Sequence, residues 1–120
     1  MGEKKILLIG RNRKNLELLS QFLSKQGYST IKAHDYESLD SSLEHGEGIG
    51  LSVIDIAGFD SRIWERCERM REKGIPFLVI SPRQSIQLQQ ASLTHGADGM
   101  LIKPLAVKEF LNLIDGMMGE

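Results

Sequence analysis

The chain has almost no cysteine and no long apolar run. Cys67 is the only cysteine among 120 residues, so an internal disulfide is excluded and a reducing compartment is the simplest expectation. No apolar stretch reaches membrane-spanning length, and no N-terminal signal of basic and then apolar residues is present. These absences predict a cytoplasmic protein with no membrane partner.

An excess of charge of either sign is also lacking. Fifteen basic and sixteen acidic residues give a formal net charge of -1. Phosphate contacts need a concentrated basic field, so we expect no nucleic-acid partner for this domain. The arginine-rich stretch 62–73 is interleaved with glutamates, which predicts a salt-bridged helix face. Three histidines lie near predicted helix ends without metal-like spacing, and we expect them to be surface caps: His34, His45 and His95.

What is present is a regular alternation of strand-like and helix-like segments. The predicted strands are residues 5–9, 28–33, 51–55, 77–80 and 100–102. The predicted helices are 12–26, one from the Asp35 cap to Gly46, 61–73, 85–95 and 107–118. The length suits one domain, expected over residues 1–120. The alternation predicts an α/β fold with a parallel sheet covered by helices on both faces.

Ligands of such sheets bind beyond the carboxyl ends of the strands, and polar residues follow four of the predicted strands there. They are Gly10-Arg11-Asn12, Asp55, Ser81 and Lys103-Pro104. A carboxylate at the end of a buried strand is costly without a partner or a task. Asp55 could pair with Arg11, or it could accept a phosphoryl group, with a hydroxyl binding a phosphoryl oxygen and a lysine neutralising charge.

The order and spacing of these segments resemble the receiver domain of a bacterial response regulator, the family of the chemotaxis receiver. The matching segments are Lys5–Ile9, Val53–Ile56, Ser81, Gly96–Gly99 and Leu101–Pro104, and the likeness covers essentially all of the chain. The resemblance implies a flavodoxin-like, doubly wound (βα)5 sandwich with a five-stranded parallel sheet in strand order 2-1-3-4-5. It also implies a signalling module rather than an enzyme.

By the same resemblance, Asp55 stands at the phosphoacceptor position, Ser81 at the hydroxyl position and Lys103 at the lysine position. Ser81 and the residue at position 100 stand at the switch positions. Proline after Lys103 is expected to fix the turn, and a cis peptide is compatible with it.

The chain departs from the family pattern at three places. Gly10 and Arg11 replace the two acids that hold Mg²⁺, which leaves Asp55 and the Ala57 carbonyl as metal ligands and predicts weak or absent Mg²⁺ binding. Met100 stands where an aromatic switch residue is usual. Pro82 follows Ser81 where a small residue is usual, and it is expected to stiffen the loop. No cofactor is therefore expected.

Two main hypotheses follow. In the first, the chain is an atypical receiver and protein-interaction module, in which both Arg11 and Lys103 hold Asp55. In the second, it is a conventional receiver phosphorylated on Asp55 by a histidine kinase. A small-molecule or flavin-binding module is a third hypothesis, although the loop 11–14 lacks the hydroxyl and glycine residues of a flavin loop.

The expected partners are a histidine kinase or another signalling protein, with a C-terminal output domain conceivable in a longer chain. In receivers generally, the last two helices and the last strand form the partner face. Here that face carries Gln87, Gln89, Gln90, Lys108 and Glu109. These residues predict a rather neutral surface and a monomer or a weak dimer.

Overall fold

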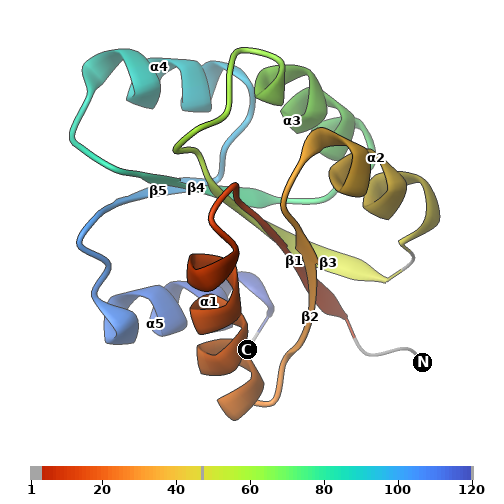
Figure 1. Cartoon of the computed structure of the whole chain (residues 1–120). Coiled ribbons are helices and arrows are strands. Elements are labelled where there is room, and N and C mark those ends of the chain that lie inside the picture. The colour runs from red at the N-terminus through yellow and green to blue at the C-terminus, as the bar shows by residue number, and fades with distance from the viewer. Residues whose placement is uncertain (1–3, 47, 120) are drawn as a thin grey trace.

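The computed structural model describes residues 4–46 and 48–119, which form one parallel sheet between two layers of helices (Figure 1). The strands are β1 (Lys5–Ile9), β2 (Ser29–Ala33), β3 (Ile49–Asp55), β4 (Phe77–Ser81) and β5 (Gly99–Ile102). The helices are α1 (Arg13–Lys25), α2 (Tyr36–His45), α3 (Ile63–Glu72), α4 (Ile86–Thr94) and α5 (Val107–Met117). The strand order is β2-β1-β3-β4-β5, which confirms the predicted flavodoxin-like fold.

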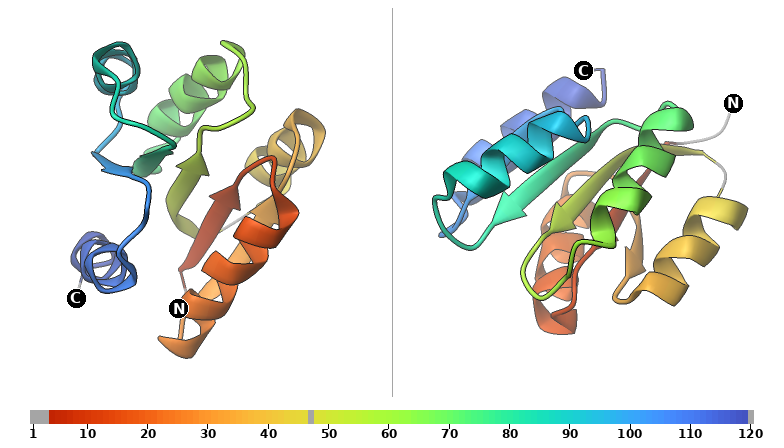
Figure 2. Two further views of the ribbon diagram at one scale, coloured as in Figure 1. Left: turned by 60° about the vertical axis from the view of Figure 1, so that its left-hand side comes forward. Right: turned by 90° about the horizontal axis from the view of Figure 1, so that it is seen from above.

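Each face of the sheet carries its own apolar core. Helices α1 and α5 cover one face, and α2, α3 and α4 cover the other (Figure 2). Alternate residues of β1 point to opposite faces, so Ile6 and Leu8 join the first core while Leu7 and Ile9 join the second. Both faces are covered, which explains why β1 and β4 are continuous apolar runs in the sequence.

Polar caps determine where the helices on either side of the site begin. The Asn12 side chain accepts a hydrogen bond from the Asn15 backbone at 3.1 Å, so α1 starts immediately after β1. Asp35 and Ser38 form a reciprocal capping box at the start of α2. Ser85 caps α4 by accepting from the Leu88 backbone. The predicted Asp35 cap is confirmed, and the other predicted boundaries lie within two residues of the observed ones.

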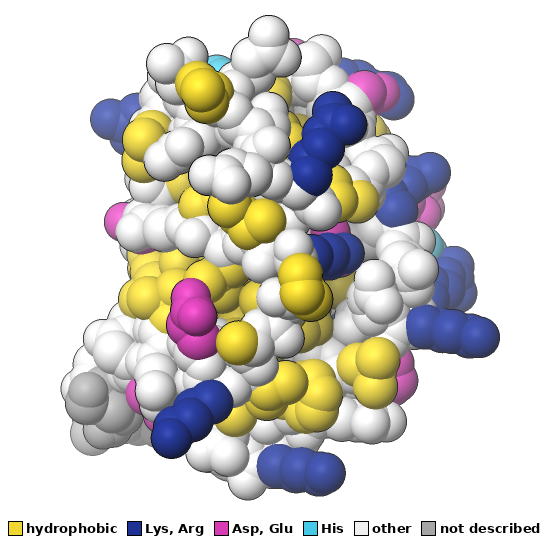
Figure 3. All heavy atoms as spheres, turned by 90° about the vertical axis from the view of Figure 1, so that its left-hand side faces the viewer, with side chains coloured by type: hydrophobic (Ala, Val, Ile, Leu, Met, Phe, Trp, Pro, Cys, Tyr) yellow, Lys and Arg dark blue, Asp and Glu magenta, His cyan; other side chains and the backbone are white. Residues whose placement is uncertain are grey.

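Helix α4 is held loosely against the sheet. Ser92 is its only buried residue within the described part of the chain, whereas Ile86 and Leu93 are 72% and 62% exposed. Nearby, Ile102 of β5 and Val107 of α5 are exposed as well. Hydrophobic side chains accordingly spread over the side formed by α4, β5 and α5 (Figure 3). Beside the uncharged glutamines that were expected on this face, α4 therefore presents apolar residues that the sequence analysis did not single out.

Helix α3 is tied to its neighbours by charged and aromatic contacts. Arg66 and Arg69 both bind Asp40 of α2, at 2.9 and 3.1 Å. The His95 ring stacks on Trp64 at 5.2 Å and binds Glu68 through Nδ1 at 2.8 Å. His95 is therefore more than the surface cap that was expected, because it joins the end of α4 to α3.

Within residues 4–46 and 48–119, no helix has the length and apolar character needed to cross a membrane.

The Cys67 thiol is predicted to be unreactive in the folded protein. Cys67 is fully buried in α3, and burial raises the pKa of its thiol to about 12. At mildly alkaline pH, a thiol reagent should modify Cys67 of the native protein only as fast as the protein unfolds, whereas modification in denaturant should be fast. The reaction is measured by absorbance, and rapid modification of the folded protein would contradict this burial.

Replacing Asp40 should make the free energy of unfolding less dependent on pH in the acidic range. Its pKa lies below the ordinary 3.8, mainly because Arg66 hydrogen-bonds to it. A carboxyl with a lowered folded-state pKa stabilises the protein above its unfolded pKa, and that contribution disappears as pH falls through the folded value. We expect Asp40→Asn to reduce the free energy of unfolding at neutral pH by about 1 kcal/mol, with the difference narrowing below pH 3.8.

Urea unfolding across this pH range measures the effect. Glu37→Gln, which removes an exposed carboxylate from the same helix, is the matched control. A stability difference between Asp40→Asn and the parent that stays constant with pH would show that the ion pair is not its source.

Candidate functional site

The ends of β3 and β5 bring an acid and a base into direct contact. The Nζ atom of Lys103 lies 2.8 Å from Oδ2 of Asp55. The Asp55 side chain is 7% exposed and that of Lys103 is 32% exposed. The Ala57 backbone N–H also points at Oδ1 of Asp55, at a long 3.4 Å. The buried carboxylate thus has a charged partner, and that partner is the predicted lysine.

A hollow of about 400 Å³ opens beside this ion pair. Its walls are Arg11, Asn12, Asn15, Asp55, Ala57, Gly58 and Lys103. Two of these residues were not predicted to take part, Asn15 and Gly58, whereas Asn12 was expected here as part of the segment after β1. The helix cap at Asn12 is the signal that could have found Asn15, because a cap directly after a strand places the first turn of the helix at the same edge as the strand end.

Arg11 does not hold Asp55. Among the described residues the ion pair on Asp55 comes from Lys103, and the Arg11 guanidinium carbon lies 5.9 Å from the Phe59 ring centroid. The expectation that both cations bind Asp55 was therefore wrong for Arg11. The backbone after β1 leaves this residue exposed, so its guanidinium keeps its water while it lies against the aromatic ring.

The neighbours of Gly10 leave little room for a side chain at this position. Gly10 is buried, and a Cβ atom there would lie 3.1 Å from Leu16 Cδ2 and 3.3 Å from Asp55 Cβ. A larger side chain at this position would require Leu16 to shift. Among the described residues no group of three or more His, Cys, Asp or Glu side chains is placed to hold a metal.

Ser81 is fully buried, and its hydroxyl binds its own loop. Its Oγ donates to the Arg83 carbonyl at 2.5 Å and accepts from the Arg83 backbone N–H at 3.4 Å. In the sheet Asp55 pairs with Ile80, so Ser81 stands one residue beyond the acid. Its role toward a phosphoryl group stays a prediction.

The two other positions marked by the sequence lie on or beside β5. Met100 is half-buried and lines a small hollow with Gln84, Ser85, Gln89 and Ile102. The Lys103–Pro104 peptide is cis, as the sequence allowed. The switch role of Met100 stays a prediction.

An apolar groove adjoins the ion pair on its other side. The groove measures about 230 Å³ and is formed by α1 and the segment after β5. Its apolar walls include Leu18, Phe22 and Leu105, and Leu18 is 50% exposed. Asp55 and Lys103 also line it. An exposed apolar surface beside a charged pair is typical of a protein contact site.

The sequence is similar to part of known response regulators. No family model matches the sequence. The response regulator MprA of Mycobacterium avium (strain 104) is 35% identical in an alignment of 111 residues that covers 89% of this chain and 47% of that protein. MprA of Mycobacterium tuberculosis (strain H37Rv) matches with the same identity and coverage. The chain therefore spans about half the length of the curated relatives it matches.

Solved structures have the same fold. The receiver domain protein (CheY-like) of Methanospirillum hungatei JF-1 superposes with a TM-score of 0.86 at 24% identity, covering 98% of this chain and 94% of that one. A two-component response regulator of Clostridium difficile gives a TM-score of 0.88 at 24% identity, covering 97% and 96%. With the strand order, these likenesses show that the chain has the CheY-like receiver fold, and most of its sequence is similar to about half of the response regulator MprA.

Proposed function

We propose that the chain is an atypical receiver that works in the cytoplasm as a protein-interaction module of two-component signalling, with weak or absent Mg²⁺-dependent phosphorylation. The observation that carries this proposal is the charge around Asp55. Two cations, Arg11 and Lys103, line the hollow with a single carboxylate. In this proposal Lys103 alone stands in for the metal.

The donor set is a poor fit for Mg²⁺. This ion prefers several oxygen ligands in an octahedral arrangement, and it is usually held by carboxylates. Here one of the two Asp55 oxygens is bound to Lys103, and Arg11 adds repulsion at the mouth of the same hollow. Phosphoryl transfer depends on such an ion for charge neutralisation. Without it, the domain would be regulated by binding or by abundance.

Two apolar surfaces support the protein-interaction role. The groove along α1 opens directly beside Asp55, and the face of α4, β5 and α5 exposes four large aliphatic side chains, Ile86, Leu93, Ile102 and Val107. Exposed apolar patches of this kind usually mark protein contacts. A histidine kinase or another signalling protein fits the first surface. The length of the curated relatives adds an output domain as a candidate partner.

One observation favours the alternative, a conventional receiver phosphorylated on Asp55. The carboxylate lies against an ammonium group and faces an open hollow, and this arrangement would suit an incoming phosphoryl group. The two proposals differ in whether Asp55 forms a metal-dependent adduct.

Beryllofluoride with Mg²⁺ should produce no stable adduct on the parent protein, because the metal lacks a site. Backbone amide NMR shifts of residues 55–57 and intact mass after acetyl phosphate treatment are the measurements. An adduct that saturates at low millimolar Mg²⁺ and disappears in Asp55→Asn would instead establish the conventional receiver.

Arg11→Asp should restore measurable Mg²⁺ binding, because it replaces a cation by an oxygen ligand at the mouth of the hollow. We expect affinity to rise by at least about tenfold, measured by NMR titration. Lys14→Asp makes the same charge change on an exposed residue outside the hollow and is the matched control. Equal gains in both variants would mean that net charge, rather than the ligand at position 11, determines binding.

A double-mutant cycle should show that Lys103 and Asp55 stabilise each other. Because the acid is buried, we expect a coupling energy of about 1 kcal/mol between Asp55→Asn and Lys103→Met in urea unfolding. The exposed pair Glu17–Lys32, also separated by 2.8 Å, is the control and should couple less. Additive effects of Asp55→Asn and Lys103→Met would show that Lys103 does not replace a metal here.

A further inference from the structure

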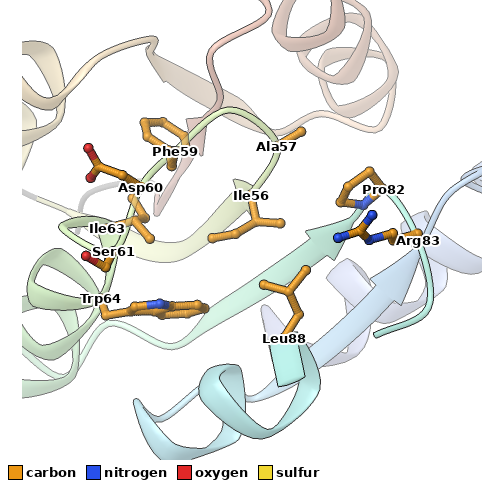
Figure 4. Close-up of a pocket in the computed structure, with 10 residues that line it drawn as sticks. All are labelled: Ile56, Ala57, Phe59, Asp60, Ser61, Ile63, Trp64, Pro82, Arg83 and Leu88. Atoms are coloured by element: carbon orange, nitrogen blue, oxygen red, sulfur yellow. The ribbon is translucent and has the colours of Figure 1, made fainter. Parts of the chain in front are cut away.

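Another hollow lies on the other face of the loop that follows Asp55. It measures about 450 Å³ and is lined by the loop after β3, the start of α3, the loop after β4 and Leu88 of α4 (Figure 4). Volumes of this size are typical of small-molecule sites. Asp55, Ser81 and Lys103 do not line it; of the residues considered so far for phosphorylation, Ala57 and Pro82 do.

The walls of this hollow are apolar and partly fixed in place. Ile56, Ile63 and Leu88 project into it, and Trp64 lies across its lower end (Figure 4). His95 stacks on one face of the indole with an interplanar angle of 11° and is itself held by Glu68. Trp64 is thereby oriented before any ligand arrives, which lowers the entropic cost of binding a flat group beside it.

The charge available at the rim is positive. Asp60 binds Arg62 at 2.8 Å and accepts from the Tyr36 hydroxyl at 2.7 Å, so its charge is already matched. The guanidinium of Arg83, an exposed residue, makes no ion pair within residues 4–46 and 48–119. In Figure 4 the Arg83 side chain lies just below Pro82, on the right-hand side of the hollow, whereas Trp64 lies at its lower left.

We infer that this hollow binds a small molecule with a flat apolar body and one anionic group, the body beside Trp64 and the anion on Arg83. Such a ligand would touch the loop after Asp55 and the loop after Ser81 at once. It would also add contacts to Leu88 of the loosely held α4. Ligand binding at this site would be a means of regulation that goes beyond the proposed function and needs no phosphorylation.

The probe for this inference is 3-phenylpropanoate, with 3-phenylpropan-1-ol as its uncharged match. Trp64 is the only tryptophan of the chain, so its fluorescence reports on this hollow alone. We expect saturable binding of the acid with a dissociation constant on the order of 1 mM, as suits a ligand of this size. The alcohol should bind roughly tenfold more weakly, because it lacks the charge-assisted contact.

Variants locate the anion contact. Arg83→Gln should weaken the acid about tenfold and leave the alcohol unchanged. Arg71→Gln removes an exposed arginine of α3 that does not line the hollow, and it should change neither affinity. Backbone amide shifts of residues 56–57 and 83–88 should move with the fluorescence and follow the same affinity.

Three results would overturn the inference. The first is no saturable change for either probe. The second is equal affinity for acid and alcohol together with no effect of Arg83→Gln, which would remove the anionic specificity. The third is fluorescence that follows protein concentration instead of probe concentration, which would assign the hollow to a second copy of the chain.

Discussion

The ion pair between Lys103 and Asp55 is the interaction on which the candidate site depends. A carboxylate almost removed from water requires a partner, and Lys103 supplies it at 2.8 Å from the end of a strand two places along the sheet. The pair therefore joins the loops after β3 and β5 and fixes the edge around which the hollow forms. The Asp55 carboxylate is kept, but one of its oxygens is already bound to the lysine.

The charge of this edge follows from two positions after β1. Gly10 leaves no room for a new side chain without a shift of Leu16, and Arg11 adds a cation to the walls of the hollow. The charged side chains beside Asp55 in this hollow are thus both cations, Arg11 and Lys103. In the proposed function, the domain would keep the shape that partners bind and would lack the oxygen ligands that metal-assisted chemistry needs.

The weakly packed α4 connects this edge to the rest of the surface. Its capping residue Ser85 follows the loop that holds Ser81, and its side chains form part of two hollows and of the exposed apolar face. An element with so little buried surface is a natural place for a conformational response, since few contacts must be broken when it moves. Binding at the surfaces around α4 would therefore alter the molecule more easily than binding against α1 or α5.

The sequence by itself determined the order and type of the elements, the sheet and the residues at its carboxyl edge, because periodicity and caps are local properties and parallel strands bring their ends together. It therefore located Asp55 and Lys103 correctly. Only the tertiary structure decided which cation reaches the acid, that Arg11 lies toward Phe59, and that α4 exposes Ile86 and Leu93. These contacts depend on the directions in which side chains from separate loops point, and the exposure of α4 depends on how closely the helix packs on the sheet. No local sequence pattern encodes these two properties.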